Sequence, residues 1–284
     1  MKILIIGGNR FFGKRLVGLL LESGHQVELL NRGNVDDGFG SSVVRTICDR
    51  TIVQDLKTAI SGKSWDIVYD QVCYDYNDAK ASCELFDGKV GKYIFTSSQS
   101  VYGPGEKIKE LDFDPSKHEF ETVETKESNY GEAKRQAEVA FSRHANFPFV
   151  AVRFPIVIGD DDYTKRFEFH VERIKNEKPI YFPCIDAKIS FVTSHFAATT
   201  LEFLGNSNFV GPINVASPGP ISLREFVKEI EDTTGQKLVA AGEGSDENHS
   251  PYGIDGDWYM DCSVLHGLSI KGSEISNWLP KLLS

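Results

Sequence analysis

Short apolar runs alternate with amphipathic stretches along the first half of the chain. The apolar runs have the length of β-strands and fall at residues 2–6, 26–31, 43–47, 66–70, 92–96 and 149–153. Between them, helical spacing of apolar positions covers residues 13–23, 52–60, 76–87 and 128–145. This alternation predicts a parallel sheet with helices on both faces. Right-handed crossovers make it a doubly wound α/β sheet, with a ligand expected at the carboxyl ends of the strands.

A glycine-rich turn joins the first strand to the first helix. Its residues are Gly7, Gly8, Asn9, Arg10, Phe11, Phe12 and Gly13. Strand, turn and helix in this order place a helix N-terminus against a pyrophosphate. Gly7 allows the tight turn, Gly8 a close approach of backbone to phosphate, and Gly13 packing of the helix on the strand. All seven are candidate cofactor contacts, although Phe11 and Phe12 are better suited to packing in the core.

Two arginines bear on which dinucleotide would bind. Arg10 stands near the place of the middle glycine in such turns, and a guanidinium there suits phosphate contacts. The second strand ends in Asn31 and Arg32, where an acidic residue would favour NAD. We therefore predict NADP, with NAD as the alternative. Asp36 and Asp37 follow closely and weaken this prediction, and Arg32 as a solvated loop residue is the competing interpretation.

Hydroxyl groups and a Tyr-x-x-x-Lys spacing form the candidate catalytic set. The strand near residues 92–96 runs on into Ser98, and Tyr130 and Lys134 share one face of the next helix. A nearby ammonium favours a phenolate, so Tyr130 is placed to transfer a proton while Ser98 fixes the same substrate oxygen. Each feature alone has a structural explanation, because such spacings occur by chance and serines cap turns. Their joint order after the glycine turn is far more specific.

These motifs resemble the extended short-chain dehydrogenase/reductases, the NAD-dependent epimerase/dehydratase family. The resemblance covers nearly the whole chain and includes the glycine turn, Thr-Ser-Ser-Gln-Ser-Val-Tyr-Gly at 96–103, Tyr-Gly-Glu-Ala-Lys at 130–134, Val-Arg-Phe-Pro at 152–155 and Gly-Pro-Ile-Asn-Val at 211–215. It implies a Rossmann-like sheet, Ser98 as the catalytic hydroxyl, Tyr130 as the proton-transferring tyrosine, and Lys134 as a lysine that also bonds the nicotinamide ribose.

The resemblance also implies further cofactor contacts. Asp49, with Arg50 beside it, matches the position near the adenine, and Pro155 to Ile158 match the loop beside the nicotinamide. The glycine turn with Asn-Arg-Gly after the second strand is similar to one subgroup, which includes chloroplast stem-loop-binding proteins and bacterial relatives.

Two departures from the family's pattern limit what the resemblance implies about the substrate. Family members that act on sugar nucleotides hold the diphosphate with arginines of the C-terminal part, but Arg224 is the only arginine after Arg173 here. Gln99 and Ser100 stand where the dehydratases carry an acid pair. We predict a nicotinamide-dependent oxidoreductase or epimerase acting on a hydroxyl or carbonyl carbon of a small molecule, with sugars and sugar nucleotides among the candidates. The alternative is a non-catalytic dinucleotide-binding sensor or an RNA-associated scaffold.

The pattern of elements changes in the second half. Helices are predicted near 163–177, 194–204, 222–234 and 273–282, with strands near 213–215 and 237–240. We predict a dinucleotide-binding domain at 1–155, with a return segment at about 190–215, and a small substrate-binding subdomain at 156–284 threaded with it. The charged segment 105–128 lacks a clear period, and is expected to be either a lid or a mobile solvated insertion.

Composition narrows the remaining classes. The net charge of −10 argues against nucleic acid as a partner, and no apolar run is long enough to span a membrane. The first strand starts at residue 2, which leaves no room for a signal peptide. Five cysteines without CxxC spacing indicate reduced thiols and a cytoplasmic protein, with Cys73 as a small buried hydrophobe. The seven histidines show no ligand pairing, so no metal site is expected. The oligomeric state stays open, with a homodimer as one alternative.

Overall fold

The computed structural model describes residues 1–283 and divides into two compact units. The first unit comprises Met1–Tyr102, Glu110–Phe154 and Ala197–Val215. The second comprises Gly103–Lys109, Pro155–Phe196 and Ala216 onward. The chain therefore passes between the units several times. The substrate-binding role that we assigned to the second half stays a prediction.

The first unit contains a seven-stranded sheet. Its strands are β1 (Lys2–Ile6), β2 (Gln26–Asn31), β3 (Val44–Ile47), β4 (Trp65–Asp70), β5 (Val90–Ser98), β7 (Phe149–Phe154) and β11 (Gly211–Asn214). They lie in the order β11-β7-β5-β4-β1-β2-β3, and every neighbouring pair is parallel. The predicted doubly wound parallel sheet is confirmed. Because all strands run the same way, their carboxyl ends share one edge.

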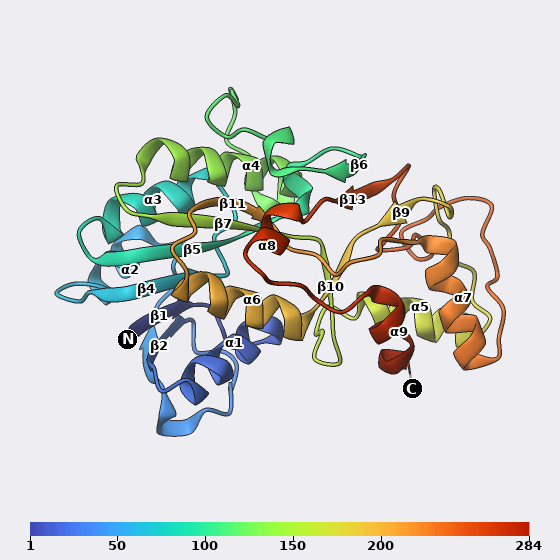
Figure 1. Cartoon of the computed structure of the whole chain (residues 1–284), viewed down its shortest axis with the longest axis horizontal. Helices are drawn as coiled ribbons and strands as arrows, with labels where there is room; N and C mark the ends of the chain where they lie inside the picture. The colour runs from blue at the N-terminus through green and yellow to red at the C-terminus, as the bar shows by residue number, and fades with distance from the viewer. Residues whose placement is uncertain (284) are drawn as a thin grey trace. The chain divides into compact units, whose positions relative to one another are not determined.

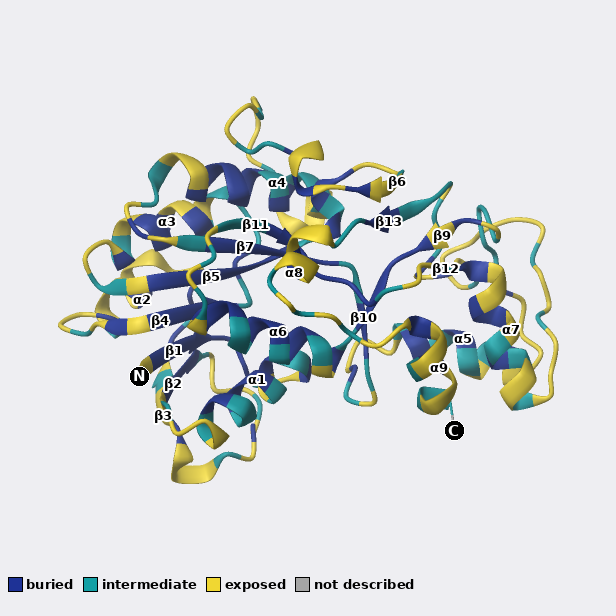
Figure 2. Ribbon diagram, viewed as in Figure 1, coloured by how far each residue is buried: buried dark blue, intermediate teal, exposed yellow. Residues whose placement is uncertain are grey.

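Helices cover both faces of this sheet (Figure 1). One face carries α2 (Val53–Ala59), α3 (Tyr76–Phe86) and α4 (Lys126–His144), and the other carries α1 (Phe11–Glu22) and α6 (Ser194–Asn206). Figure 2 shows the central strands buried along most of their length. Such strands are continuous apolar runs because both of their faces are covered. This explains why the periodicity of the sequence located them.

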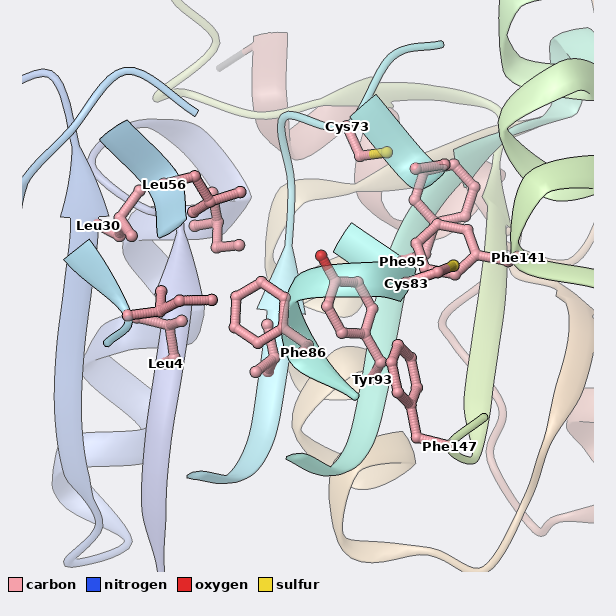
Figure 3. Packing of buried hydrophobic residues seen from close by; sticks show 14 of the residues in the cluster. Leu4, Leu30, Leu56, Cys73, Cys83, Phe86, Tyr93, Phe95, Phe141 and Phe147 are labelled. Carbon is pink, nitrogen blue, oxygen red and sulfur yellow. The ribbon is translucent and has the colours of Figure 1, made fainter. Parts of the chain in front are cut away.

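An aromatic core fills the face under α3 and α4. Tyr93 lies between Phe86 and Phe147, at ring-centroid distances of 5.6 and 5.5 Å, and Phe95 faces Phe141 at 5.0 Å (Figure 3). Cys73 is fully buried in the same cluster, as predicted. Burial raises the pKa of the Cys73 thiol well above its usual range, so this cysteine is an inert packing residue.

The second unit is built from shorter elements. Its helices are α5 (Arg166–Lys175), α7 (Leu223–Thr234), α8 (Ser263–Gly267) and α9 (Ile275–Leu283), and its strands are β6 (Gly105–Ile108), β8 (Ile156–Ile158), β9 (Lys188–Ile189), β10 (Phe191–Thr193), β12 (Ile221–Ser222) and β13 (Trp258–Met260). Strands β12-β9-β13-β6 form one sheet and β10-β8 another. The predicted strand at 237–240 is wrong, since only Ala240 bridges there, to Ile180.

The segment 105–128, which we expected to be a lid or a mobile solvated insertion, contains regular structure. It begins with β6, which pairs with β13, and continues into a 3-10 turn at Glu110–Asp112. Carbonyls of Glu110 and Phe113 accept hydrogen bonds from Arg153. Pairing partners this distant in sequence leave no local period, which is why the sequence pattern predicted no element there. No helix within residues 1–283 has the length and apolar character needed to cross a membrane.

Candidate active site

The glycine turn after β1 adopts a conformation that requires glycine. Gly7 and Gly8 have φ of 95° and 75°, in the left-handed region that side chains rarely adopt. A Cβ on Gly8 would lie 2.6 Å from Cγ2 of Ile5. A Cβ on Gly13 would overlap with the side chain of Gln71. The turn is therefore drawn tightly over the end of the strand, as a phosphate-binding turn must be.

The N-terminus of α1 fits an anion. Arg10 occupies the N-cap with an extended backbone and supplies no side-chain cap, and the first turn holds no acidic residue. The positive end of the helix is therefore not offset by a carboxylate from its own first turn. Asn9 and Arg10 lie in this turn, half-buried and exposed respectively. The turn thus fits the pyrophosphate of a dinucleotide.

The two phenylalanines of the turn pack against other rings. Phe11 is buried and contacts Phe12 at 5.5 Å between ring centroids, and Phe12 contacts Phe154 at 5.6 Å. Phe11 also has φ of 53°. Their side chains hold the turn in place, so Phe11 can contact a cofactor only through its backbone.

The ends of β2 and β3 bring the adenosine-side candidates together. Asn31 Oδ1 accepts a hydrogen bond from the Gly33 amide at 2.9 Å, and Arg32 is exposed. Asp49 follows the neighbouring strand and accepts two hydrogen bonds from Thr51. These bonds, together with the positive charge of Arg32, lower the pKa of the Asp49 carboxyl. Asn31, Arg32 and Asp49 therefore lie at one corner of the sheet edge.

The side chain of Arg50, which we predicted as a cofactor contact, is bound inside the unit. Its guanidinium is buried and forms ion pairs with Asp70 at 2.7 Å and Asp78 at 2.8 Å, and it donates to Ser82 at 2.7 Å. Tyr93 donates to the same Asp70 oxygen. We therefore correct the predicted cofactor contact of the Arg50 side chain, because Asp70 and Asp78 neutralise its charge inside the unit.

Lys134 is buried beside Tyr130. Its Nζ donates to the carbonyls of Cys73 at 2.6 Å and Thr96 at 2.9 Å, and lies 6.0 Å from the centre of the Tyr130 ring. No carboxylate pairs with this ammonium anywhere in residues 1–283. An ammonium has three N–H donors, so one remains after the two carbonyls. Lys134 thus keeps an uncompensated charge and a donor at the sheet edge.

A break in α4 sets the position of Tyr130. Asn129 has an extended backbone (φ −156°, ψ 93°) inside the helix, and its Oδ1 accepts the Glu132 amide at 3.1 Å. This is the geometry of an N-cap, so the helix restarts with Tyr130 in its first turn. The positive end of the restarted helix and Lys134 both lie near the Tyr130 ring. Tyr130 is 41% exposed, which makes it reachable by a ligand.

Close contacts hold Ser98 against the start of this helix. Ser98 ends β5, is half-buried and accepts a hydrogen bond from the Ser100 amide at 3.1 Å. A Cβ on Gly131 would lie 2.8 Å from the Ser100 carbonyl oxygen, so only glycine permits this approach. Arg135 donates to the carbonyl of Val101 at 2.8 Å. The structure therefore brings the segments of Ser98, Tyr130 and Lys134 together.

Beneath this site lies a charge network that the sequence analysis missed. Arg153 is fully buried and pairs with Glu138 at 2.5 Å, and Ser97 donates to the same carboxylate. Arg153 also donates to Tyr102, whose hydroxyl donates to Asn214 at 2.7 Å. The signal was present, because Arg153 and Asn214 belong to the Val-Arg-Phe-Pro and Gly-Pro-Ile-Asn-Val motifs. The network ties β5, α4, β7 and β11 together.

The nicotinamide-side candidates belong to the second unit. Pro155 is half-buried, whereas the Ile158 side chain is fully buried in the core of that unit. The predicted contact from the Ile158 side chain is corrected for this reason, and only its backbone remains a candidate. No group of three or more potential metal ligands occurs in the described chain.

Fold and site together define a Rossmann-like α/β protein in which the segments of a serine, a tyrosine and a lysine meet at the carboxyl edge of the sheet. The chain belongs to the NAD-dependent epimerase/dehydratase family, whose model matches residues 3–192. It is 28% identical over 221 residues to the chloroplast stem-loop binding protein of 41 kDa b from Arabidopsis thaliana. That alignment covers 72% of this chain but 55% of the relative, so the chain spans about half of the relative's length.

Solved structures share the fold over the full chain. UDP-glucose 4-epimerase from Thermotoga maritima, determined with UDP-glucose, matches with a TM-score of 0.78 and 16% identity, covering 100% of this chain and 97% of that one. UDP-glucuronic acid 4-epimerase from Bacillus cereus, determined with NAD, matches with a TM-score of 0.75 and 18% identity, covering 100% and 97%. At these identities, the likeness is one of fold.

Proposed function

We propose that this protein is an enzyme that moves a hydride between a nicotinamide dinucleotide and a carbon bearing a hydroxyl or carbonyl. The observation that carries the proposal is Lys134, a buried ammonium without a carboxylate partner, adjacent to Tyr130. Burying an unpaired charge is costly, so a fold that keeps one at a ligand-binding edge does so for chemistry. Family membership supports an enzyme of the epimerase/dehydratase class.

The cofactor fits the residues at the sheet edge. Gly7, Gly8 and the N-terminus of α1 would hold the pyrophosphate, with Asn31 and Asp49 at the adenosine end. The bound nicotinamide would supply the hydride acceptor or donor. Neighbouring structures of the same fold contain NAD, which supports a nicotinamide dinucleotide here as well.

NADP is the dinucleotide we favour over NAD. Arg32 is exposed directly after β2, and the strand ends in the uncharged Asn31 where an acidic residue would favour NAD. Of Asp36 and Asp37, which weakened this prediction in the sequence, Asp37 is ion-paired with Arg45 at 2.5 Å. Its carboxylate therefore does not offset Arg32. Arg10 adds a second guanidinium in the glycine turn, and such groups suit a 2′-phosphate.

Tyr130 would transfer the proton that accompanies the hydride. The helix start at Tyr130 and the ammonium of Lys134 place positive potential beside its ring, where negative charge would develop on the reacting oxygen. Ser98 would hydrogen-bond the reacting oxygen, since a hydroxyl can rotate away from Ser100 to face a ligand. Net reduction or oxidation and epimerisation through a keto intermediate are both compatible with these roles.

The substrate we propose is a small molecule with a sugar-like hydroxyl, and sugar nucleotides are candidates because structural neighbours are UDP-sugar epimerases. Arg224, the one arginine late in the chain, is already paired with Asp186 at 2.6 Å. A substrate without a diphosphate therefore fits at least as well. RNA binding is the second candidate, suggested by the Arabidopsis relative's name, but a net charge of −10 opposes it.

The test is hydride transfer from labelled cofactor to a panel of sugars, sugar nucleotides and small ketones. With a substrate in hand, Tyr130→Phe keeps the ring and removes the proton, so turnover should fall by about 10²–10⁴-fold while cofactor affinity stays nearly constant. Tyr69→Phe is the matched control, because its hydroxyl is buried in the core without a hydrogen-bond partner. Full activity of Tyr130→Phe, or no hydride transfer to any compound, would overturn the proposal.

A further inference from the structure

The carboxamide of Gln71 lies against the glycine turn and has no hydrogen-bond partner among residues 1–283. Gln71 directly follows β4, and its amide N–H donates to the carbonyl of Ile6 at 3.1 Å, which fixes its backbone at the end of β1. Its carboxamide makes no hydrogen bond to any residue in 1–283, and the Nε2 atom is buried. A buried amide without a partner costs free energy, and in native proteins such groups are rare.

Two glycines show where this carboxamide lies. A Cβ on Gly7 would be 3.6 Å from the Gln71 Cβ, and a Cβ on Gly13 would overlap with Gln71 Oε1. The carboxamide therefore lies along the first turn of α1, at the positive end of that helix. Rotation about the last side-chain bond exchanges the oxygen and nitrogen, so the N–H donors can face either side of this position.

We propose that Gln71 is a cofactor-binding residue that donates a hydrogen bond to the diphosphate of the dinucleotide. The inference rests on the proposed function, since it concerns the same ligand. An anion at the start of α1 would meet the helix N-terminus and the Gln71 amide together. A neutral donor adds to the attraction of the helix end without placing a competing charge beside it. Hydrogen bonds to charged groups are the stronger ones, which explains why an unpartnered amide is kept there.

The first test is Gln71→Leu, which removes the amide at similar size. Calorimetric titration should show the affinity for NADP⁺, NAD⁺ and ADP-ribose falling by about 10- to 100-fold, because all three carry the diphosphate. The melting temperature of the ligand-free variant should stay equal or rise, because an unsatisfied buried amide has been removed. A residue with a merely structural role would instead lower it. Gln26→Leu is the control, since Gln26 is exposed at the opposite end of β2.

The second test is Gln71→Glu, which keeps the shape of the side chain and replaces a donor with a carboxylate. Its affinity for the three ligands should fall further than that of Gln71→Leu, because the carboxylate repels the diphosphate. Unchanged affinity in both variants, while the unmodified protein binds, would overturn this inference alone. Failure of the unmodified protein to bind any nicotinamide dinucleotide would overturn the proposed function as well.

Discussion

Arg153 and Lys134 are both buried cations under the carboxyl edge of the same sheet, yet their surroundings treat them differently. Arg153 is ion-paired with Glu138 and also donates to a tyrosine hydroxyl and two backbone carbonyls. Lys134 has two backbone carbonyls and the faces of aromatic rings around it, with no carboxylate among the described residues. Glu138 neutralises the charge of Arg153, whereas no carboxylate among the described residues neutralises the charge of Lys134.

This difference separates support from chemistry. A cation whose charge is fully compensated exerts little field on a ligand, and it serves to hold its elements together. A buried cation without a counter-ion carries a desolvation cost and keeps its charge available. Arg50, with Asp70 and Asp78, belongs with Arg153. Lys92 is also buried without a carboxylate partner and donates to the carbonyls of Leu204 and Ser207. Lys134 differs from it in lying beside Tyr130, which is the position suited to acting on a bound molecule.

The largest effect on stability is expected from Glu138→Gln. The change keeps the shape of the side chain but leaves Arg153 buried and unpaired. The free energy of unfolding should fall by about 3–5 kcal/mol, measured by urea denaturation. Glu127→Gln on the same helix is the control, because its side chain is exposed. A loss below about 1 kcal/mol for Glu138→Gln would mean that the Arg153 pair is not a structural support.

His170, a buried side chain that is uncharged at neutral pH, extends the comparison to a group whose burial disfavours charge. His170 in the second unit is fully buried and bonded to Ser250 and the Arg166 carbonyl, and burial lowers the pKa of His170 to about 4. The unfolded chain, with a histidine pKa near 6.5, takes up the proton first. Stability should therefore be constant above about pH 6.5 and decline by about 3 kcal/mol as the pH falls to 4.

His170→Gln should remove most of this acid decline in denaturation curves recorded between pH 7 and 4. His195→Gln is the matched control, because His195 is exposed in the same unit. An acid decline of the same size in His170→Gln and in the unmodified protein would show that this histidine is not the group that titrates.

The exposed Arg32 should affect the affinity for the dinucleotide but not the free energy of unfolding. Arg32→Ala should lower the affinity for NADP⁺ at least tenfold, while the affinity for NAD⁺ changes little, because only NADP carries the 2′-phosphate. The free energy of unfolding should stay within about 0.5 kcal/mol of the original, as is usual for surface sites. Equal affinities of the unmodified protein for the two dinucleotides would contradict the preference for NADP.

The sequence predicted the sheet and its site motifs because both are local. Strands buried on both faces are apolar runs, and the glycine turn and Tyr130 with Lys134 are close in sequence. Short strands such as β6 were missed because Gly105 pairs with Trp258, a partner that no local pattern reveals. The segment 237–240 has the residues of a strand but a single bridge, since nothing extends the pairing beyond Ala240.

The interaction partners of a side chain, which the sequence does not reveal, also explain the errors in the predicted site. Arg50 looked like a cofactor contact because it follows β3, but Asp70 and Asp78 from two other elements bind it inside the unit. Gln71 was missed because a single glutamine after a strand carries no sequence signal. Its importance rests on the lack of a partner, and only the packing of Gly7 and Gly13 around it shows this.

The most direct test of the account is Lys134→Met, with two quantities measured on the same protein. Methionine fills the volume, and replacing an unpaired buried charge with an apolar group is often neutral or stabilising. We predict that the free energy of unfolding stays within about 1 kcal/mol of the original or rises, while cofactor affinity falls at least tenfold. A stability loss of about 3–5 kcal/mol with unchanged cofactor affinity would place Lys134 beside Arg153 as a structural residue and contradict the account.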